Sequence, residues 1–136
     1  MNVPVMDLKD KRIFLIEDNI GNQTIAKTLL ESHGAIVASH RTGHDVIPHL
    51  ERFEPVDLII VDLMLPSGVT GYDVVNNIQR HNQFDCVPII AMSVIDRSEA
   101  IPQAKKRGFS GFISKPIQFG NFPRQIASVI AGEEIW

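Results

Sequence analysis

Cysteine is nearly absent from the sequence, and long hydrophobic runs are missing. The 136 residues include one cysteine, Cys86, which excludes an internal disulfide bond and is typical of a reducing compartment. No apolar run approaches the roughly 20 residues that cross a bilayer. The first 12 residues lack the apolar core of a signal peptide. We therefore expect a cytoplasmic protein without a membrane segment.

Basic charge is also scarce. The chain has 13 Lys and Arg against 16 Asp and Glu, a formal net charge of -3. This balance argues against a nucleic-acid partner, because such partners are usually bound by a surplus of basic side chains. The length suits one domain, since domains commonly have about 100–150 residues. We place this domain at residues 12–131, after an N-terminal extension (1–11) and before a C-terminal tail (132–136).

Five short apolar runs predict buried β-strands. They are bounded by Gly, Pro, Asp or Asn and rich in β-branched residues: 13–16, 36–38, 56–61, 87–92 and 111–113. Continuous apolarity, rather than alternation, is typical of strands that are buried on both faces of a parallel sheet.

Segments with helical spacing follow these runs. The first presents Ile25, Ala26, Leu29 and Leu30 on one face, and Gly34 suits its end. The inward residues of three further helices are Val46, Ile47, Leu50 and Phe53; Val74, Val75 and Ile78; and Ile126, Val129 and Ile130. Strand and helix alternate five times, which predicts an α/β fold: a flavodoxin-like, doubly wound parallel sheet with strand order 2-1-3-4-5.

Some local features qualify this picture. Thr42 can cap the second helix, in which Pro48 is expected to introduce a kink. Pro102 predicts that the fourth helix, between residues 96 and 107, is short or starts late. We expect Cys86 to be a small packing residue at the start of the fourth strand.

Chemically capable side chains follow four of the five runs. They are Glu17 and Asp18 after the first, Asp62 after the third, Ser93 after the fourth and Lys115 after the fifth. Ligands of open parallel sheets bind beyond the carboxyl ends of the strands. Neighbouring carboxylates repel each other, and a hard cation such as Mg²⁺ relieves that repulsion. A carboxylate can also accept a phosphoryl group, whose oxygens an ammonium and a hydroxyl then stabilise.

Each of these residues has a plain structural explanation as well. Glu17 and Asp18 can form a strand-end turn, Asp62 and Lys115 can be solvated, and Ser93 can be a cap. Their coincidence at four strand ends favours phosphoryl transfer onto a carboxylate. Three histidines (40, 44 and 49) have spacings that suggest a metal site, but no cysteine lies near them, so we expect a surface role.

The chain resembles the receiver domains of two-component response regulators. The resemblance rests on four motifs and covers about residues 12–131: LIEDN (15–19), VDLMLPSG (61–68), MSV (92–94) and GFISKP (111–116). The separations from Asp18 to Asp62, 44 residues, and from Ser93 to Lys115, 22 residues, also match the family pattern.

The resemblance implies a metal site and a phosphoacceptor. Asp62 matches the residue that receives the phosphoryl group. Glu17 and Asp18 match the acidic pair that holds Mg²⁺ together with Asp62, and the backbone carbonyl of Met64 matches a further ligand.

The resemblance also implies a switch. Ser93 matches the hydroxyl that moves to meet the phosphoryl group, and Lys115 matches the phosphate-binding lysine, whose bond to Pro116 is typically cis. Phe112 matches the aromatic residue that rotates inward on activation. Such a switch is a population shift between two loop arrangements.

The chain departs from the family pattern in several places. Glu17 replaces a more common aspartate, and the loop at residues 67–70 is one residue longer than usual. Val94 is larger than the usual residue and is expected to narrow access to Asp62. Met64 and Ile95 stand where side chains tune hydrolysis. Because both are apolar, we expect slow self-dephosphorylation.

The resemblance implies a phosphoacceptor switch rather than an enzyme, apart from its own phosphotransfer and slow dephosphorylation. A histidine kinase or histidine phosphotransfer protein is the expected donor, and a downstream protein target is the expected output partner. The face with Phe109, Phe112 and Phe119 is a candidate partner surface. Phe122 is expected to pack against the domain, and Trp136 is expected to be flexible at the end of the chain.

Three alternatives stay open at this point. The first is a pseudo-receiver interaction module that is not phosphorylated, and the second is a receiver fragment of a larger hybrid kinase. The third, a hydrolase with an aspartyl-phosphate intermediate, is disfavoured because Met64 stands where that class needs a second aspartate.

Overall fold

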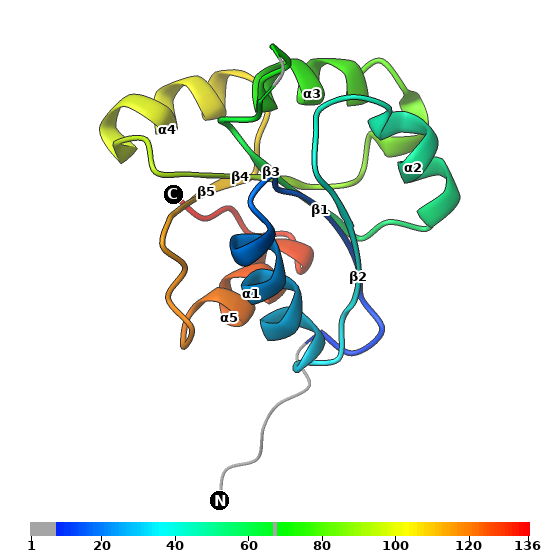
Figure 1. The fold of residues 1–136 in the computed structure, drawn as a ribbon, viewed down its shortest axis with the longest axis vertical. Helices are drawn as coiled ribbons and strands as arrows, with labels where there is room; N and C mark the ends of the chain where they lie inside the picture. The colour runs from blue at the N-terminus through cyan, green and yellow to red at the C-terminus, as the bar shows by residue number, and fades with distance from the viewer. Residues whose placement is uncertain (1–7, 67) are drawn as a thin grey trace, which may run out of the picture.

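The predicted parallel sheet is confirmed. A computed structural model describes residues 8–66 and 68–136, so the loop predicted at 67–70 lies partly outside the described residues. The strands are β1 (Arg12–Ile16), β2 (Ile36–His40), β3 (Leu58–Asp62), β4 (Ile89–Ser93) and β5 (Gly111–Ser114). They pair in parallel in the order β2-β1-β3-β4-β5, as expected for right-handed strand–helix–strand units (Figure 1).

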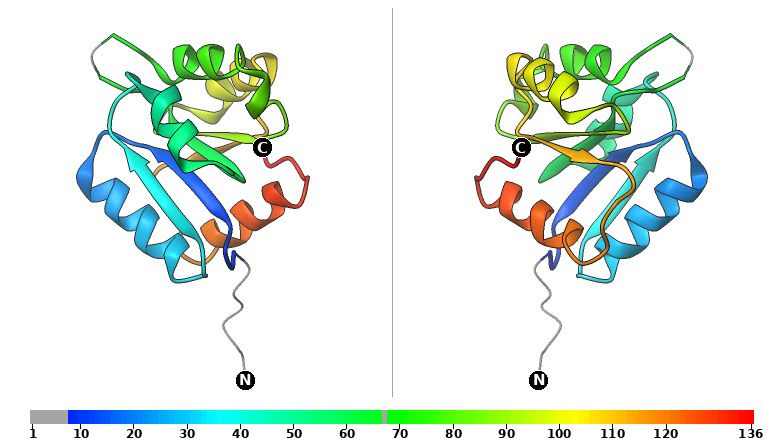
Figure 2. Two further views of the ribbon diagram at one scale, coloured as in Figure 1. Left: turned by 90° about the vertical axis from the view of Figure 1, so that its right-hand side faces the viewer. Right: turned by 90° about the vertical axis from the view of Figure 1, so that its left-hand side faces the viewer.

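Helices cover both faces of the sheet. They are α1 (Ile20–Glu31), α2 (Val46–Phe53), α3 (Gly71–Ile78), α4 (Arg97–Lys106) and α5 (Phe122–Ile130), with a short 3-10 turn η1 (Asn82–Phe84). Figures 1 and 2 show α1 and α5 on one face and α2, α3 and α4 on the other. Within the described ranges, every helix is too short or too polar to cross a membrane.

Two hydrophobic cores lie on the two faces of the sheet. In β3, Leu58 and Ile60 join the core under α1 and α5, while Ile59 and Val61 join the core under α2, α3 and α4. All four side chains are fully buried, which explains the uninterrupted apolar run in the sequence. Each such burial contributes about 1.5–3 kcal/mol, so the central strand fixes the position of the residue that ends it, Asp62.

The helix starts differ from three predictions. Asp96 caps α4 by accepting a hydrogen bond from the Ser98 N–H (2.8 Å), so α4 begins before Pro102 and is not delayed by it. Pro48 lies in the first turn of α2, where no N–H partner is needed, and not in an interior. Thr42 does not cap α2, because its hydroxyl accepts from the His44 N–H instead (3.1 Å).

Other differences concern exposed and terminal residues. Cys86 is exposed in the turn before β4, because β4 begins only after Pro88, and Ile25 on α1 is also exposed. At the N-terminal side, Leu8 is fully buried in the core under α1 and α5. At the C-terminal side, Trp136 is half-buried rather than free, since the preceding residue Ile135 forms a parallel bridge to Gly111.

Candidate functional site

The sheet brings the predicted site residues to one edge. Asp62 and Ser93 end the neighbouring strands β3 and β4, and their strands are in register, with Asp62 opposite Met92. Glu17 and Asp18 directly follow β1, the other neighbour of β3, and Lys115 directly follows β5. Parallel strands end at the same edge, so all five side chains gather beyond the carboxyl end of β3.

Three carboxylates form a tight cluster. Glu17, Asp18 and Asp62 each offer an oxygen atom within 4.8 Å of the others. Glu17 and Asp62 are buried, with 0% and 3% of their surface exposed, whereas Asp18 is half-buried. The backbone N–H of Asn19 holds Glu17 Oε2 (3.1 Å), and the backbone N–H of Met64 holds Asp62 Oδ1 (2.9 Å). Both buried carboxylates are therefore oriented by the loops that follow their strands.

Lys115 supplies the positive charge of the site. Its Nζ lies 2.7 Å from Glu17 Oε1 and 2.9 Å from Asp62 Oδ2. The bond between Lys115 and Pro116 is cis, as the resemblance implied. One ammonium thus serves two carboxylates, and a third carboxylate, Asp18, stands beside them, so the cluster carries an excess of negative charge.

Burial shifts the protonation of this cluster. Loss of solvent raises the pKa of Glu17 above its ordinary value of 4.5; Lys115 and the Asn19 N–H oppose the shift, and the charge of Asp62 adds to it. Burial alone would lower the pKa of Lys115, but the close contacts of its ammonium with the carboxylates of Glu17 and Asp62 outweigh that effect and raise it. Lys115 is therefore a cation at neutral pH.

The cluster fits a divalent cation. Glu17 Oε1 is buried and, although it faces the Lys115 ammonium, has no hydrogen-bond partner of good geometry among the described residues. Carboxylate oxygens are the ligands that Mg²⁺ prefers, and the uncompensated negative charge favours its binding. Elsewhere in the described ranges, including at His40, His44 and His49, no comparable group of three ligands occurs. The rings of His40 and His49 stack at 4.3 Å between centroids instead.

The expected switch residues lie next to the cluster. Ser93 is fully buried, and its Oγ accepts a hydrogen bond from the Ile95 N–H (3.1 Å). The Ser93 carbonyl accepts from the Lys115 N–H (2.9 Å), which ties the end of β4 to the lysine. Phe112 is buried in the core under α4, so its ring already lies inward. Of the three phenylalanines on the expected partner face, Phe119 alone is exposed.

Four exposed apolar side chains follow the site residues closely in the chain, and we call them the apolar rim. Ile20, Met64, Val94 and Phe119 are all exposed, Val94 by 69%. Each follows one of the site residues by only a few positions, so the rim is built by the loops that carry the chemistry. Val94 points to solvent at this rim. In the sequence, the signal for this group is the placement of large apolar residues within a few positions of the polar strand ends.

Comparisons with known proteins agree with this geometry. Residues 13–127 match the response regulator receiver domain family. Protein PilH of Pseudomonas aeruginosa is 24% identical over 89% of this chain and 98% of its own length. The polar-differentiation response regulator DivK of Brucella ovis is 27% identical over 88% of this chain and 96% of its own length.

Two solved structures share the fold. The chemotaxis protein CheY4 of Vibrio cholerae has a TM-score of 0.81 at 20% identity, covering 88% of this chain and 98% of that chain. The receiver domain of the sensor histidine kinase PA1611 of Pseudomonas aeruginosa has a TM-score of 0.79 at 27% identity, covering 90% and 99%, and that structure holds a magnesium ion in its active-site cleft. The family match spans most of the sequence and the same carboxyl-end cluster, so the chain belongs to the response regulator receiver domain family of two-component systems.

Proposed function

We propose that this receiver accepts a phosphoryl group on Asp62 and thereby switches a protein–protein surface. The observation that carries the proposal is the convergence of Asp62 with Lys115 and two further carboxylates at the carboxyl end of β3. Asp62 is the nucleophile because it is the central carboxylate, held by the Met64 N–H at Oδ1 and facing Lys115 at Oδ2. Glu17 is more deeply enclosed and Asp18 lacks a described cation partner.

The residues have separate tasks in the transfer. An Asp62 oxygen forms a bond to phosphorus while the bond from phosphorus to the donor nitrogen breaks. The Lys115 ammonium stabilises the charge on the transferred oxygens, and the Ser93 hydroxyl donates to them after leaving the Ile95 N–H. Glu17, Asp18, Asp62 and the Met64 carbonyl are the proposed Mg²⁺ ligands. Bound Mg²⁺ would neutralise carboxylate and phosphoryl charge in this site.

A protein donor suits the entrance to the site. The donor is a phosphohistidine of a histidine kinase or a histidine phosphotransfer protein, whose ring must reach a nearly buried carboxylate. The apolar rim of Ile20, Met64, Val94 and Phe119 offers such a partner a surface that excludes water. This exclusion protects the phosphoryl group from hydrolysis during transfer.

The test is the intact mass of the protein after incubation with acetyl phosphate. We expect one phosphoryl adduct that requires Mg²⁺ and is lost in Asp62→Asn. The matched control, Asp73→Asn, changes an exposed carboxylate at the start of α3 and should leave the adduct in place. If natural protein with Mg²⁺ gives no adduct from either acetyl phosphate or a phosphorylated partner, the chain is a pseudo-receiver and the proposal fails.

A further inference from the structure

The outer edge of β5 is partly covered by the last residues of the same chain. β5 is the last strand in the sheet order, and such an edge leaves N–H and C=O groups open for strand addition. Ile135 fills part of this edge as a parallel bridge to Gly111. The Phe112 N–H donates to the Ile135 carbonyl (2.9 Å), and the Ile135 N–H donates to the Ser110 carbonyl (3.1 Å).

The approach of this segment explains Gly111. A Cβ at this position would lie 2.5 Å from both Cγ1 and the carbonyl oxygen of Ile135, which is closer than real Cβ atoms come. Any larger residue would therefore push the segment away from β5. Glycine at residue 111 is needed for strand addition, not for an unusual backbone angle.

Side chains fasten the segment to α4. Arg97 donates to the Trp136 carbonyl, and Lys105 Nζ lies 5.2 Å from the centre of the Trp136 ring. The Trp136 Nε1–H in turn donates to Glu134 Oε1 (2.9 Å). The segment is acidic and aromatic, whereas the α4 side of the groove is basic, so their charges are complementary.

The groove continues beyond the segment. Because the bridge is parallel, a strand that extended past the position of Trp136 would run beside Ile113 and Ser114 of β5. A cavity of about 220 Å³ lies there, lined by Arg97, Phe112, Ile113, Ser114, Gln118 and Gln125, among others. Residues 133–136 do not line this cavity, which adjoins them along β5.

We propose that Glu133–Trp136 is a built-in competitor on the β5 edge, which an extended partner segment of similar acidic and aromatic character displaces. The partner adds as a parallel strand to β5 and gains contacts in the adjoining cavity that the resident segment does not make. A tethered segment acts at an effective concentration of about millimolar, so only partners with these added contacts bind well. This inference does not depend on phosphorylation of Asp62.

The test uses a fluorescent, C-terminally amidated peptide with the sequence of residues 131–136 and the folded chain of 136 residues. We expect weak binding to the natural protein and clearly tighter binding to the variant Ile135→Ser/Trp136→Ala, whose own segment is loosened. Adding Gly111→Ala to that variant should abolish peptide binding, because the new Cβ blocks any strand at this edge. Gly120→Ala is the matched control, since a Cβ there meets nothing within 4 Å.

Three outcomes would overturn the proposal. If the peptide does not bind the loosened variant, the segment is a permanent part of the sheet. Trp136→Ala alone is a second, milder variant for the case in which the double variant fails to fold. If Gly111→Ala does not reduce binding, the peptide binds elsewhere. If the natural protein forms dimers that the loosened variant does not, the occupant is the segment of a second copy.

Discussion

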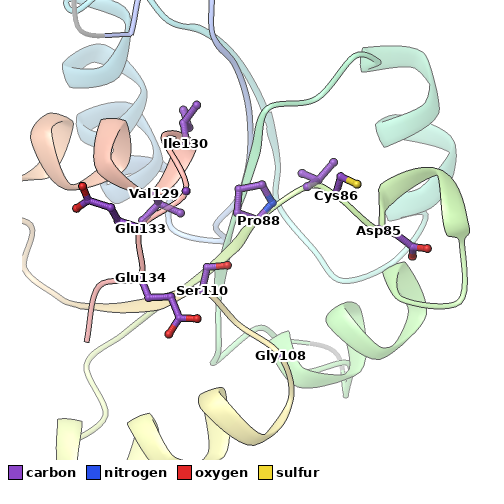
Figure 3. Close-up of a pocket in the computed structure, with 11 residues that line it drawn as sticks. Asp85, Cys86, Pro88, Gly108, Ser110, Val129, Ile130, Glu133 and Glu134 are labelled. Atoms are coloured by element: carbon purple, nitrogen blue, oxygen red, sulfur yellow. The ribbon is translucent and has the colours of Figure 1, made fainter.

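The two ends of the sheet differ in their side chains and in their cavities. The candidate site lies at the end where charged side chains meet, and not at the end with the larger cavity. At the carboxyl end, the buried carboxylates Glu17 and Asp62 share the single ammonium of Lys115. At the amino end, a cavity of about 320 Å³ opens between the starts of β4 and β5 and the end of α5 (Figure 3). Its polar side chains, among them Asp85, Glu133 and Glu134, are exposed. The larger cavity thus lies at the amino end of the sheet, and the cluster of interacting charged groups lies at the carboxyl end.

The largest expected effect is the loss of phosphorylation rate when the ammonium of Lys115, at the carboxyl end of the sheet, is removed. Lys115→Met should slow adduct formation from acetyl phosphate by roughly 10²–10³-fold, because a charge that stabilises the transferred oxygens is lost. The rate is measured by intact mass over time. Lys106→Met removes an exposed cation from α4 and is the matched control. Equal rates in the two variants would show that Lys115 does not contact the phosphoryl group.

A smaller effect is expected for the metal. Glu17→Gln should weaken Mg²⁺ binding about tenfold or more, equivalent to about 1.4 kcal/mol, because one of the clustered carboxylates becomes neutral. Isothermal titration calorimetry measures the affinity. Glu133→Gln, a matched change at the amino-end cavity, should leave it unchanged. If Glu133→Gln lost more Mg²⁺ affinity than Glu17→Gln, the metal would bind at the amino end of the sheet, which would contradict the proposed site.

The stability of the metal-free protein should respond to Glu17 with a defined sign. Burial raises the pKa of Glu17 in the folded state, so folding favours its protonated form. This stabilisation is complete below the ordinary pKa of 4.5 and is lost as the pH rises through the raised value. Glu17→Gln stays neutral, so it should have the higher free energy of unfolding at neutral pH, and this advantage should shrink as the pH falls. Urea unfolding at several pH values, without metal, provides the comparison.

The lifetime of the phosphoryl group should depend on the rim. Met64 is 56% exposed beside Asp62 and offers no polar group to position a water molecule. Met64→Asn should therefore accelerate loss of the adduct by up to about tenfold, which is less than the roughly 10²–10⁴-fold that a well-positioned general acid or base contributes. Ile20→Asn, which changes another exposed apolar side chain near the site, is the control. Loss of the natural adduct within seconds would contradict the expectation of slow self-dephosphorylation.

The smallest effect is expected at the amino end. Cys86 is exposed at the cavity, so Cys86→Ser should change the free energy of unfolding by less than about 0.5 kcal/mol. Adduct formation should be unchanged as well. A marked slowing would mean that the two ends of the sheet are coupled, which nothing in the contacts of Cys86 predicts.

Most of the fold and the arrangement of the site could be predicted because both follow from local patterns. Uninterrupted apolar runs such as residues 58–61 identify strands buried on both faces, and the order of strand and helix then limits the topology. Because parallel strands end at one edge, the positions of Glu17, Asp62, Ser93 and Lys115 along the chain were enough to place them together. Their proposed roles stay predictions that the experiments above test.

The remaining features depend on contacts between distant residues, which local patterns do not encode. The prediction of a late start for α4 was wrong, because the cap formed by Asp96 and Ser98 outweighs the preference of Pro102 for a first turn. The place of Trp136 was missed because Ile135 binds an edge 24 residues earlier in the chain, at Gly111. Cys86 was misplaced because strand β4 begins later than its apolar run.

The most direct test of the central claim identifies the carboxylate that carries the phosphoryl group. The protein is incubated with acetyl phosphate and Mg²⁺, treated with borohydride, which reduces an acyl phosphate to an alcohol, and mapped by peptide mass spectrometry. We expect reduction of Asp62 to homoserine, and no change at Glu17 or Asp18. A reduced side chain at Glu17 or Asp18, with Asp62 intact, would contradict it.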